Sequence, residues 1–496
     1  MYQQQLKEMT CTHPAAVSLF PFLKYRKHAI ISCLLIYPLT KRDLHPGRNS
    51  ILSFLYHLYM TQVISWKKRT GSRIAFLLKL LLTLIVLPII YGICIVFTNG
   101  ISQGKLAAGI TILIVLVTGW LFYRLRWLSS RPRLFTCLFI LLTFIVFVIY
   151  TVIPVASDQA IKRPADLPGV TTKYWLLKTG SKIAYYQFNA QPGVTKKETP
   201  IIFIHGGPGA YVRQLEVDFF STFTAEGYDV YLYDQVGAGR SGQLPKSAYS
   251  HKRNIQDFEA ILDKINARQY IVIGQSYGAS MLAHLTANAV IAKRIAKAII
   301  TEPAITVKEA EHPVYARSPN ALKDNVDMPF RIFLGFVVNP TGEFTAQNEV
   351  INYFAAHTDL TQKIFRNSFP ATDSNQLPKV DISVINFSIV GIIPRQVPSY
   401  DQHLAEDYKK VHVPTMLMLG ESSYIERNAP MDLLAINPNI TRSQYIKNAG
   451  HILWNGLHNN NQIVKRSMLE FLNDQPPTIP DYPKQSDIKK FLENRL

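Results

Sequence analysis

A serine between two glycines is the residue of this chain with the clearest chemical potential. Ser276 lies at the centre of a Gly-Gln-Ser-Tyr-Gly pentapeptide, after the apolar run 270–273 and before the small-residue stretch 278–283. The apolar run predicts a strand and the small residues predict a helix. A strand, a Gly-x-Ser-x-Gly turn and a helix form a nucleophile elbow, in which the two glycines prevent clashes between strand and helix. We therefore predict that Ser276 is a nucleophile for acyl transfer.

A general base must accompany this serine, because a neutral hydroxyl is a poor nucleophile. His451 is the best candidate, since it lies in the loop after the last predicted strand, at 442–446. A serine in an elbow, followed by a histidine near the C-terminus, is a known chain order for such a pair. We therefore predict that His451 takes the proton of Ser276.

Two backbone N–H groups must face the negative charge that develops on the substrate's carbonyl oxygen. One is expected from Tyr277, the residue directly after the nucleophile. The other is expected from Gly207, in the His-Gly-Gly-Pro-Gly loop at 205–209 that follows the apolar run 200–204. Because Gly207 has no side chain, its backbone can approach a substrate closely. An ordinary Gly-Pro turn is the alternative interpretation of this loop.

Three motifs, taken in this order, resemble the α/β-hydrolase superfamily, with the proline iminopeptidase-like branch as the best match. They are the loop at 205–209, Asp-Gln-Val-Gly-Ala-Gly-Arg-Ser at 234–241 and the elbow, and the likeness covers residues 173–473. The resemblance implies that the other motif residues are structural, with Asp234 and Arg240 in polar contacts within their loop. These structural residues are His205, Gly206, Pro208, Gly209, Asp234, Gln235, Gly237, Gly239, Gly274 and Gly278.

The acid that orients the histidine is where the chain departs from this family. The resemblance implies an Asp three residues beyond the Gly that ends the penultimate strand, and Ser423 occupies that position. A serine cannot stabilise an imidazolium by charge. Glu302 is the predicted acid instead, because it follows the predicted strand 295–301 and resembles the strand-end acid of some α/β hydrolases. Glu421 and Glu426 are the alternatives, and a plain loop acid or helix cap is the other interpretation of Glu302.

No pattern in the sequence predicts a metal or a cofactor. All four cysteines lie before residue 156, so the globular part has no disulfide and no Cys-based metal site. Four histidines lack the spacing of metal ligands, namely His312, His357, His403 and His412. The glycine-rich stretches lie in a hydrolase context rather than in a nucleotide-binding loop. We expect no cofactor and no metal.

Eight apolar runs must position these residues. They are expected as strands at 173–177, 182–188, 200–204, 229–233, 270–273, 295–301, 415–419 and 442–446. Helical patterns alternate with them, among others at 255–265 and 462–472. Continuous apolar strands that alternate with helices indicate an α/β fold with a mostly parallel sheet and helices on both faces. The resemblance implies the eight-stranded α/β-hydrolase fold, with residues 304–410 as a helical cap insertion.

The N-terminal third has the composition of a membrane segment. Runs at 74–97, 106–122 and 134–155 each approach the ~20 apolar residues that a helix needs to cross a bilayer. Residues 1–156 carry 17 Lys or Arg and two acids, which leaves only +4 of the net charge of +19 for the rest of the chain. This distribution is typical of membrane topology and argues against a nucleic-acid partner. We predict three transmembrane helices before the α/β domain.

The orientation of these helices follows from the charges of their connections. Basic residues precede the first run and fill the second connection, at 123–133, whereas the first connection, at 98–105, has a single Lys. The positive-inside rule then places the N-terminus in the cytoplasm. Three crossings put the hydrolase domain outside the cytoplasm, so the expected localisation is a multi-pass membrane protein with the lipid bilayer as a partner.

The predicted domain organisation follows from these features. Its parts are a basic N-terminal segment (1–72), the membrane segment (73–156), a linker (157–170), the first part of the core (171–303), the cap (304–410), the second part of the core (411–475) and a C-terminal tail (476–496). Met60 opens a stretch that resembles a normal start before a membrane helix. Translation from Met60 is therefore a further hypothesis.

The expected function is a membrane-anchored, extracytoplasmic serine hydrolase that works through an acyl-enzyme. The resemblance implies a proline iminopeptidase-like aminopeptidase with a small-molecule or peptide substrate, whose free amine would need acids such as Glu309 and Glu311. An esterase or lipase for lipid-derived or small acyl substrates is the second hypothesis, because the cap has apolar stretches at 330–338 and 382–393. A non-catalytic binding protein on a hydrolase fold is the third, and the missing Asp is its only support.

Overall fold

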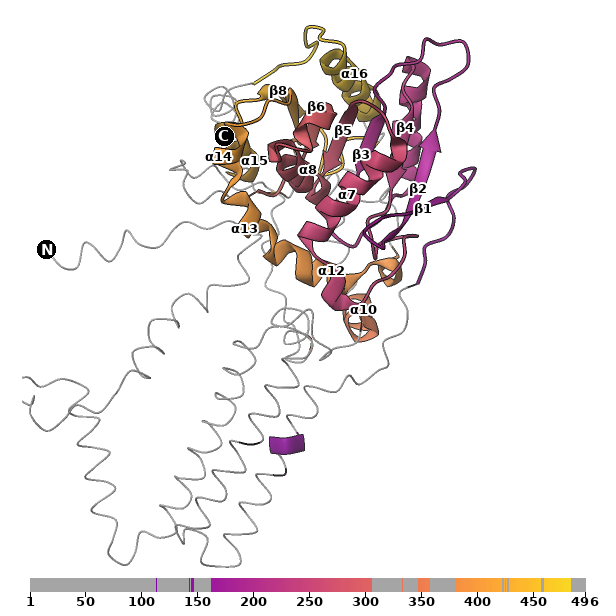
Figure 1. Ribbon diagram of the computed structural model, residues 1–496, viewed down its shortest axis with the longest axis vertical. Helices are drawn as coiled ribbons and strands as arrows, with labels where there is room; N and C mark the ends of the chain where they lie inside the picture. The colour runs from indigo at the N-terminus through magenta and orange to yellow at the C-terminus, as the bar shows by residue number, and fades with distance from the viewer. Residues whose placement is uncertain are drawn as a thin grey trace, which may run out of the picture. The chain divides into compact units, whose positions relative to one another are not determined.

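An eight-stranded sheet organises the part of the chain that the computed structural model describes (Figure 1). The described residues are 162–305, 332, 347–356, 381–421, 423, 425, 428–455 and 459–482, together with 113, 142 and 144–146. All of them except the last five belong to one compact unit.

The strands run in the order β1-β2-β4-β3-β5-β6-β7-β8 across the sheet. Their bounds are β1 (Lys173–Leu176), β2 (Lys182–Phe188), β3 (Ile201–Ile204), β4 (Val230–Tyr233), β5 (Tyr270–Gln275), β6 (Ile295–Thr301), β7 (Thr415–Gly420) and β8 (Ile440–Ile446). The pairs β1–β2 and β2–β4 are antiparallel and the other pairs are parallel. The predicted mostly parallel eight-stranded sheet is therefore confirmed.

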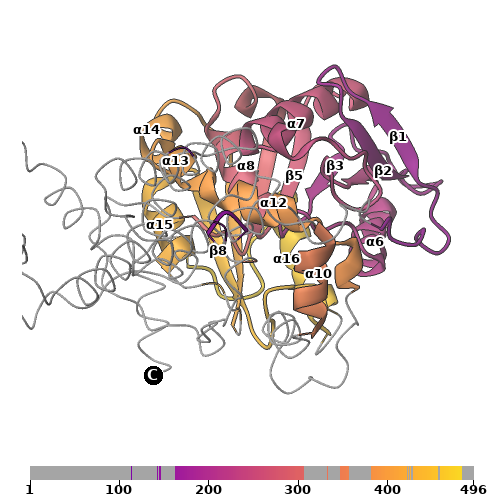
Figure 2. The ribbon, with the colours of Figure 1, turned by 90° about the horizontal axis from the view of Figure 1, so that it is seen from below.

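The alternation of side chains along the strands divides the interior into two apolar cores. In β3, Ile202 and Ile204 belong to one core, whereas Ile201 and Phe203 belong to the other. Successive side chains point to opposite faces of a strand, so a continuous apolar run needs cover on both sides. Figure 2 shows helices on both sides of the strands. One face carries α7 (His251–Ile265) and α8 (Tyr277–Ala287), and the other carries α6 (Gln214–Phe220) and α16 (Asn460–Leu472).

The segment between β6 and β7 is mostly helical in its described residues. Its helices are α10 (Gln347–Ala356), η6 (Ile382–Val384), α12 (Phe387–Ile392), η7 (Ile393–Arg395), α13 (Val397–Asp401) and α14 (Leu404–Tyr408). The remaining elements are η1 (Ser221–Glu226), η2 (Lys246–Ala248), η3 (Ala292–Arg294) and α15 (Asn428–Ile436). Both α13 and α14 contact α8, so this segment packs on the helix that follows the nucleophile elbow.

The start of α7 lies four residues before the predicted start at residue 255. Its N-cap is Ser250, whose side chain accepts a hydrogen bond from the backbone N–H of Arg253 at 3.0 Å. Such a cap satisfies one of the four N–H groups that lack a partner in the first turn. The prediction followed the apolar periodicity, which begins only at Ile255, and so it missed the polar first turn.

The prediction of three transmembrane helices is wrong for the structure described here. Within the residues named above, no helix is both long and apolar enough to cross a membrane. The three apolar runs lie outside the described residues, apart from positions 113, 142 and 144–146, and so do the segment 1–72 and its Met60. The fold class is corrected to the α/β domain alone, and the predicted localisation is withdrawn with the helices. The hydropathy of a sequence window and the charges of its loops do not determine how long a helix is in the folded protein.

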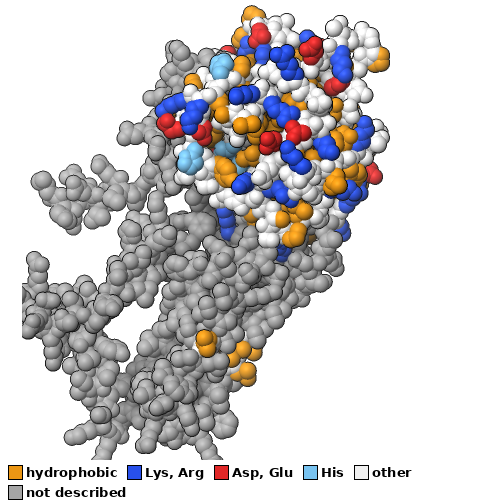
Figure 3. Space-filling view, viewed as in Figure 1, with side chains coloured by type: hydrophobic (Ala, Val, Ile, Leu, Met, Phe, Trp, Pro, Cys, Tyr) orange, Lys and Arg blue, Asp and Glu red, His pale blue; other side chains and the backbone are white. Residues whose placement is uncertain are grey.

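The surface of the α/β domain carries charges of both signs. On the face shown in Figure 3, Lys and Arg side chains are interspersed with Asp and Glu. Asp263, for example, accepts hydrogen bonds from Lys178 at 2.7 Å and from Arg294 at 2.6 Å. Exposed pairs of this kind contribute little to stability. The small positive charge of this part of the chain is therefore not gathered into one basic area on this face.

Candidate active site

Ser276 lies on a strained turn between β5 and α8. Its φ of 56° falls in the left-handed region that favours glycine. The turn is held on both sides, because the N–H of Ser276 donates to the carbonyl of Thr301 at 2.9 Å and its own carbonyl accepts from Ser280 at 3.0 Å. Only 9% of Ser276 is exposed. Strained residues that are fixed in this way cluster at functional sites.

Three glycines bring the loop after β3 against this turn. A Cβ on Gly274 would overlap the carbonyl of Gly278, and a Cβ on Gly278 would overlap the carbonyls at the end of β3. A Cβ on Gly206 would overlap the side chains of Gln275 and Ser276. The loop at 205–209 therefore lies in direct contact with the nucleophile turn.

The two predicted oxyanion donors flank the elbow. Tyr277 is the first residue of α8, where the helix dipole presents partial positive charge. Gly207 has a φ of +48°, which suits glycine, and its carbonyl accepts from the N–H of Ala210 at 2.7 Å. In the loops and turns of the described domain, neither Tyr277 nor Gly207 donates a backbone hydrogen bond. Within the described loops and turns, both N–H groups therefore lack a backbone acceptor.

His451 lies directly after β8 and against the elbow. The side-chain amide of Gln275 donates to the backbone carbonyl of His451 at 3.3 Å, and only 4% of the histidine is exposed. The loop begins at Asn448, whose φ of 56° is a conformation that Asn tolerates better than most residues. The structure therefore brings the loop of the predicted base into contact with Gln275, the residue before the predicted nucleophile.

Two different side chains face Nδ1 of His451. Glu302 Oε2 lies 3.7 Å from this nitrogen, and Ser423 Oγ lies 3.4 Å from it. Glu302 is 1% exposed, and its Oε1 accepts a hydrogen bond from the backbone N–H of Gly420 at the end of β7. Its φ of 55° makes Glu302 a second strained non-glycine residue at this site. The carboxylate is thus buried beside the imidazole and held by backbone.

Of the other two candidate acids, Glu421 is the one that the structure describes. Glu421 Oε2 accepts from the backbone N–H of Asn448 at 2.9 Å, so it contacts the start of the histidine loop. Glu426 lies outside the described residues, as do Glu309 and Glu311. Of the acids whose placement is described, Glu302 is the one in an ion-pair contact with His451.

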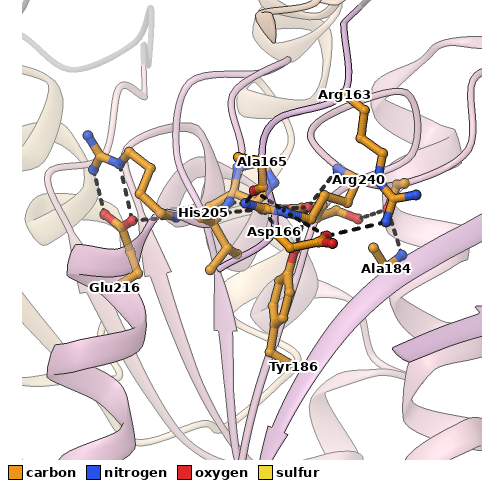
Figure 4. Close-up of polar contacts among 12 residues, drawn as sticks. Arg163, Ala165, Asp166, Ala184, Tyr186, His205, Glu216 and Arg240 are labelled. Atoms are coloured by element: carbon orange, nitrogen blue, oxygen red, sulfur yellow. Dashed lines mark hydrogen bonds and ion pairs between the residues drawn. The ribbon is translucent and has the colours of Figure 1, made fainter. Parts of the chain in front are cut away.

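A buried polar network supports the loops around the elbow (Figure 4). Asp234 accepts hydrogen bonds from the backbone N–H of Val212 at 2.7 Å and of Arg240 at 2.8 Å, and from the hydroxyl of Tyr186 at 2.9 Å. The guanidinium of Arg240 donates to the hydroxyl of Tyr186 at 3.0 Å and to the carbonyl of Ala165. Burial raises the pKa of Asp234. These hydrogen bonds agree with the polar contacts that the family resemblance implied for Asp234 and Arg240.

His205 and Gln235 join this network to the loop of Gly207. The backbone N–H of Gln235 donates to Nε2 of His205 at 3.0 Å, and the side-chain amide of Gln235 donates to the carbonyl of His205 at 2.9 Å. Because Nε2 accepts, the proton of the neutral ring lies on Nδ1, 2.9 Å from the carbonyl of Gly206. Burial lowers the pKa of His205, which favours this neutral form.

The segment between β6 and β7 contacts the same loops through Asn386. The N–H of Asn386 donates to the carbonyl of Gly209 at 3.1 Å, and its side-chain amide donates to the carbonyl of Gly237 at 2.8 Å. A Cβ on Gly209 would also overlap the carbonyl of Asn386. The helix α12 therefore begins directly on the two loops that carry the glycine-rich motifs at 205–209 and 234–241.

Sequence reasoning missed a second group of buried polar residues near the elbow. His251, His284 and Asp401 are hydrogen-bonded in series, and the series ends at the hydroxyl of Tyr277. One signal was present in the sequence, because Tyr277 and His284 are seven residues apart and share a face of a helix. Nothing in the sequence pointed to His251 or Asp401.

No metal-binding group of three or more His, Cys, Asp or Glu side chains occurs among the residues that the structure describes. Of the scattered histidines, His412 Nδ1 lies 2.9 Å from the side chain of Asn439, and His403 Nε2 lies 3.2 Å from that of Gln402. His312 and His357 lie outside the described residues.

Comparison with known families gives a match over the region that contains this site. Residues 199–453 match the sequence model of the family described as "alpha/beta hydrolase fold". This region begins just before β3 and ends just after His451, so it includes the elbow, Glu302 and the helices between β6 and β7.

The curated relatives are similar over a shorter stretch. A proline iminopeptidase of Heyndrickxia coagulans is 27% identical over 106 residues, which are 21% of this chain and 34% of that protein. A proline iminopeptidase of Lactobacillus delbrueckii subsp. lactis is 30% identical over 94 residues, which are 18% of this chain and 31% of that protein. The matched stretch thus spans about a third of the length of these relatives.

Solved structures are similar at low sequence identity. A serine hydrolase of Cycloclasticus zankles is 15% identical, with a TM-score of 0.43 and coverage of 62% of this chain and 98% of that chain. An esterase of Exiguobacterium antarcticum is 14% identical, with a TM-score of 0.40 and coverage of 61% of this chain and all of that chain.

Proposed function

Because this chain belongs to the alpha/beta hydrolase fold family, we propose that it is a serine hydrolase that cleaves a small amide or ester through an acyl-enzyme. One observation carries the proposal: Ser276, His451 and Glu302 follow β5, β8 and β6, at the carboxyl ends of parallel strands. Ligands of open α/β sheets bind at this edge.

The proposed reaction has two halves. In the first, Ser276 Oγ attacks the acyl carbon while His451 takes the hydroxyl proton, and the same proton is then given to the leaving amine or alcohol. In the second, water attacks the acyl carbon while His451 takes a proton from that water. The bond from the acyl carbon to Ser276 Oγ then breaks, the carboxylic acid leaves, and His451 gives the proton back to Oγ. The backbone N–H groups of Gly207 and Tyr277 stabilise the oxyanion in both halves.

Glu302 is the proposed acid because, of the two described side chains that face Nδ1 of His451, it is the one that can carry a negative charge. Ser423 lies slightly closer to Nδ1, at 3.4 Å against 3.7 Å, but its hydroxyl is neutral. The carboxylate of Glu302 is buried, so its attraction to a protonated His451 is little screened by water. Hydrogen bonds of catalytic groups are often long before a substrate binds, so 3.7 Å is compatible with this role.

The proposed substrate is a short peptide with an N-terminal proline, or a similar small amide. The stretches of 94 and 106 residues shared with proline iminopeptidases support this choice. Hydrolysis of short acyl esters is the second candidate, because α12 brings the buried apolar side chain of Ile389 against Gly209.

Covalent labelling tests the proposal. A fluorophosphonate probe should label the wild-type protein on Ser276, and Ser276→Ala should abolish the labelling while the folded structure remains. Release of proline from a prolyl amide would then favour the peptidase. Release of p-nitrophenol from short acyl esters, with no release of proline from the prolyl amide, would favour the esterase. A folded wild-type protein that the probe does not label would overturn the proposed function.

A further inference from the structure

A buried chain of hydrogen bonds leads from α13 to the residue after the nucleophile. The hydroxyl of Tyr277 lies 3.0 Å from His251 Nδ1, and His251 Nε2 lies 3.0 Å from His284 Nδ1. His284 Nε2 in turn lies 2.9 Å from Asp401 Oδ1. All four residues are buried, with at most 7% of any of them exposed.

The protons of this chain have one consistent arrangement when both imidazoles are neutral. Asp401 can only accept, so His284 donates from Nε2 and accepts at Nδ1. His251 must then donate from Nε2 and accept at Nδ1, and the hydroxyl of Tyr277 donates to it. Asn254 completes the arrangement, because its amide donates to the same hydroxyl at 2.8 Å. Burial and the neighbouring His284 lower the pKa of His251 to about 3, which keeps its ring neutral near pH 7.

The chain joins three separate helices. His251 is the first residue of α7, and its backbone N–H donates to the side chain of Gln396 at 2.8 Å. His284 lies near the end of α8, and Asp401 is the last residue of α13. The ring of Tyr400 packs edge-on against the ring of His251, with 4.7 Å between the ring centroids. The side chain of Tyr277 is therefore held by residues far away in the sequence.

We propose that Asp401, His284 and His251 are positioning residues, which act through the Tyr277 side chain to fix the Tyr277 backbone N–H as an oxyanion donor. The inference rests on the proposed function. Tyr277 opens α8 directly after the strained Ser276, so an anchored ring limits the movement of this first peptide group. A donor must lie within about 0.5 Å of its working place to be effective. The hydrogen-bond direction set by Asp401 makes the hydroxyl of Tyr277 a donor with a fixed acceptor.

Two variants break the chain at different points. Tyr277→Phe removes the hydroxyl but keeps the ring and the backbone N–H, and His284→Asn breaks the chain at a residue that does not contact the elbow turn. The measurement is the rate of covalent labelling by a fluorophosphonate, separated into the maximal rate constant kinact and the concentration for half-maximal rate KI. This probe places negative charge on an oxygen in the oxyanion site, whichever substrate the protein uses.

Both variants should lower kinact roughly 10-fold while KI changes less than about twofold, because a misplaced donor weakens only the transition state. The double variant should be no slower than the slower single one, since both substitutions break the same chain. The matched control is Tyr408→Phe, which removes another buried hydroxyl. That hydroxyl donates to the backbone carbonyl of Ala283 in α8 at 2.8 Å. Its kinact should stay within about twofold of the wild type at a similar loss of stability.

The outcomes separate the two proposals. The wild type could be labelled while the variants Tyr277→Phe and His284→Asn react as fast as Tyr408→Phe. This result would overturn the positioning role but would not affect the proposed serine hydrolase function. Equal loss of kinact in all three variants would also overturn it, because the effect would then follow stability alone. A wild type that is not labelled at Ser276 would overturn the proposed function and the positioning role together. Thermal unfolding of each variant shows whether Tyr277→Phe, the smallest change, is folded.

Discussion

Glu302 has a backbone conformation that few glutamates adopt. Its φ of 55° costs on the order of 1–3 kcal/mol and persists only where the surroundings fix it. Here the N–H of Glu302 donates to the carbonyl of Met418 at 3.2 Å, and its carboxylate accepts from Gly420. Both contacts come from β7, the neighbouring strand. The neighbouring strand therefore holds this carboxylate in a strained position that faces His451.

The first prediction concerns this carboxylate. Glu302→Gln keeps the size of the side chain but removes the charge that stabilises a protonated His451, so we expect kcat to fall roughly 10²- to 10⁴-fold. Steady-state kinetics on the substrate found by the labelling and release assays measures this, and thermal unfolding checks the fold. Glu421→Gln is the matched control, since Glu421 is another acid beside the histidine loop, where its carboxylate accepts from the backbone N–H of Asn448. Near-normal turnover of Glu302→Gln would move the assignment to Glu421 or Glu426.

The second prediction concerns the pH dependence of stability. The pKa of His251 is about 3 in the folded protein against an ordinary value of 6.5. Between these values the unfolded chain binds more protons, so the free energy of unfolding falls as the pH drops from 6.5 towards 3. The slope from this one group is about 1.4 kcal/mol per pH unit.

Urea unfolding of the wild type and of His251→Gln at pH 7, 6, 5 and 4.5 measures this slope. The variant should show a smaller loss of stability on acidification. Other buried groups, such as His205 with its lowered pKa and Asp234 with its raised pKa, contribute to both proteins and cancel in the difference. Parallel curves for the two proteins would contradict the assignment of a neutral buried His251.

At the scale of elements, α8 is the helix on which the site depends. All 11 of its residues are buried, and small side chains such as Gly278 and Ala279 let it pass directly beside β3 and β5. Its first residue is Tyr277 and its far end carries His284, so the same helix connects the oxyanion site to α13. A change in the packing of α8 should therefore alter both stability and reactivity.

The third prediction tests this packing. Gly278→Ala would raise the helix propensity of α8 by about 1 kcal/mol, yet the added Cβ would overlap the carbonyls of Ile204 and His205. We expect a net loss of about 1–3 kcal/mol in the free energy of unfolding, together with slower labelling of Ser276. Gly180→Ala is the control, because that glycine has a positive φ but no atom near its added Cβ. Normal labelling of a Gly278→Ala protein would show that the β3 loop can shift without harm.

At the scale of the whole domain, three segments that are far apart in the chain meet at the carboxyl ends of neighbouring strands. The strand β7 lies between β6 and β8, and its last residue, Gly420, contacts both sides. Its N–H donates to Glu302, and a Cβ on Gly420 would overlap the carbonyl of Gly450, next to His451. The absence of a side chain here lets the histidine loop and the carboxylate approach each other across a strand.

The fourth prediction concerns the contact between the sheet and the last helix. Lys297 of β6 donates to the carbonyls of Phe471 at 2.9 Å and Leu472 at 3.1 Å, and to Asp474 at 2.6 Å. A cation at a helix C-terminus satisfies carbonyls that have no partner within the helix. Lys297→Met should therefore lower the free energy of unfolding by about 1–3 kcal/mol. Denaturant unfolding measures this loss, and labelling of Ser276 should be unchanged.

Lys178→Met is the matched control for this contact. Lys178 pairs with Asp263 at 2.7 Å, but 65% of its side chain is exposed, whereas the side chain of Lys297 is only 16% exposed. Exposed ion pairs are screened by water and salt, so no measurable change in stability is expected from Lys178→Met. Equal effects of the two substitutions would contradict the role of Lys297 as a cap of α16.

Local patterns determined much of this protein. Continuous apolar runs and turn residues located all eight strands within a few residues, and β6 coincides with the predicted 295–301. The elbow and the loop at 205–209 were also readable, because short-range sterics restrict those positions to glycine. The chain order then predicted Ser276 and His451 as a nucleophile and its base. These features depend on residues that are close in sequence, which is why the sequence alone could indicate them.

Only the tertiary structure decided the features that depend on distant residues. Nδ1 of His451 faces both Glu302 and Ser423, which come from different strands. The series from Asp401 to Tyr277 joins three helices, and the sequence showed only the shared helix face of Tyr277 and His284. Hydropathy alone led to three membrane-crossing helices, and the described structure contains none. Local sequence restricts backbone conformation, whereas the partner of a buried polar group is set by how strands and helices pack.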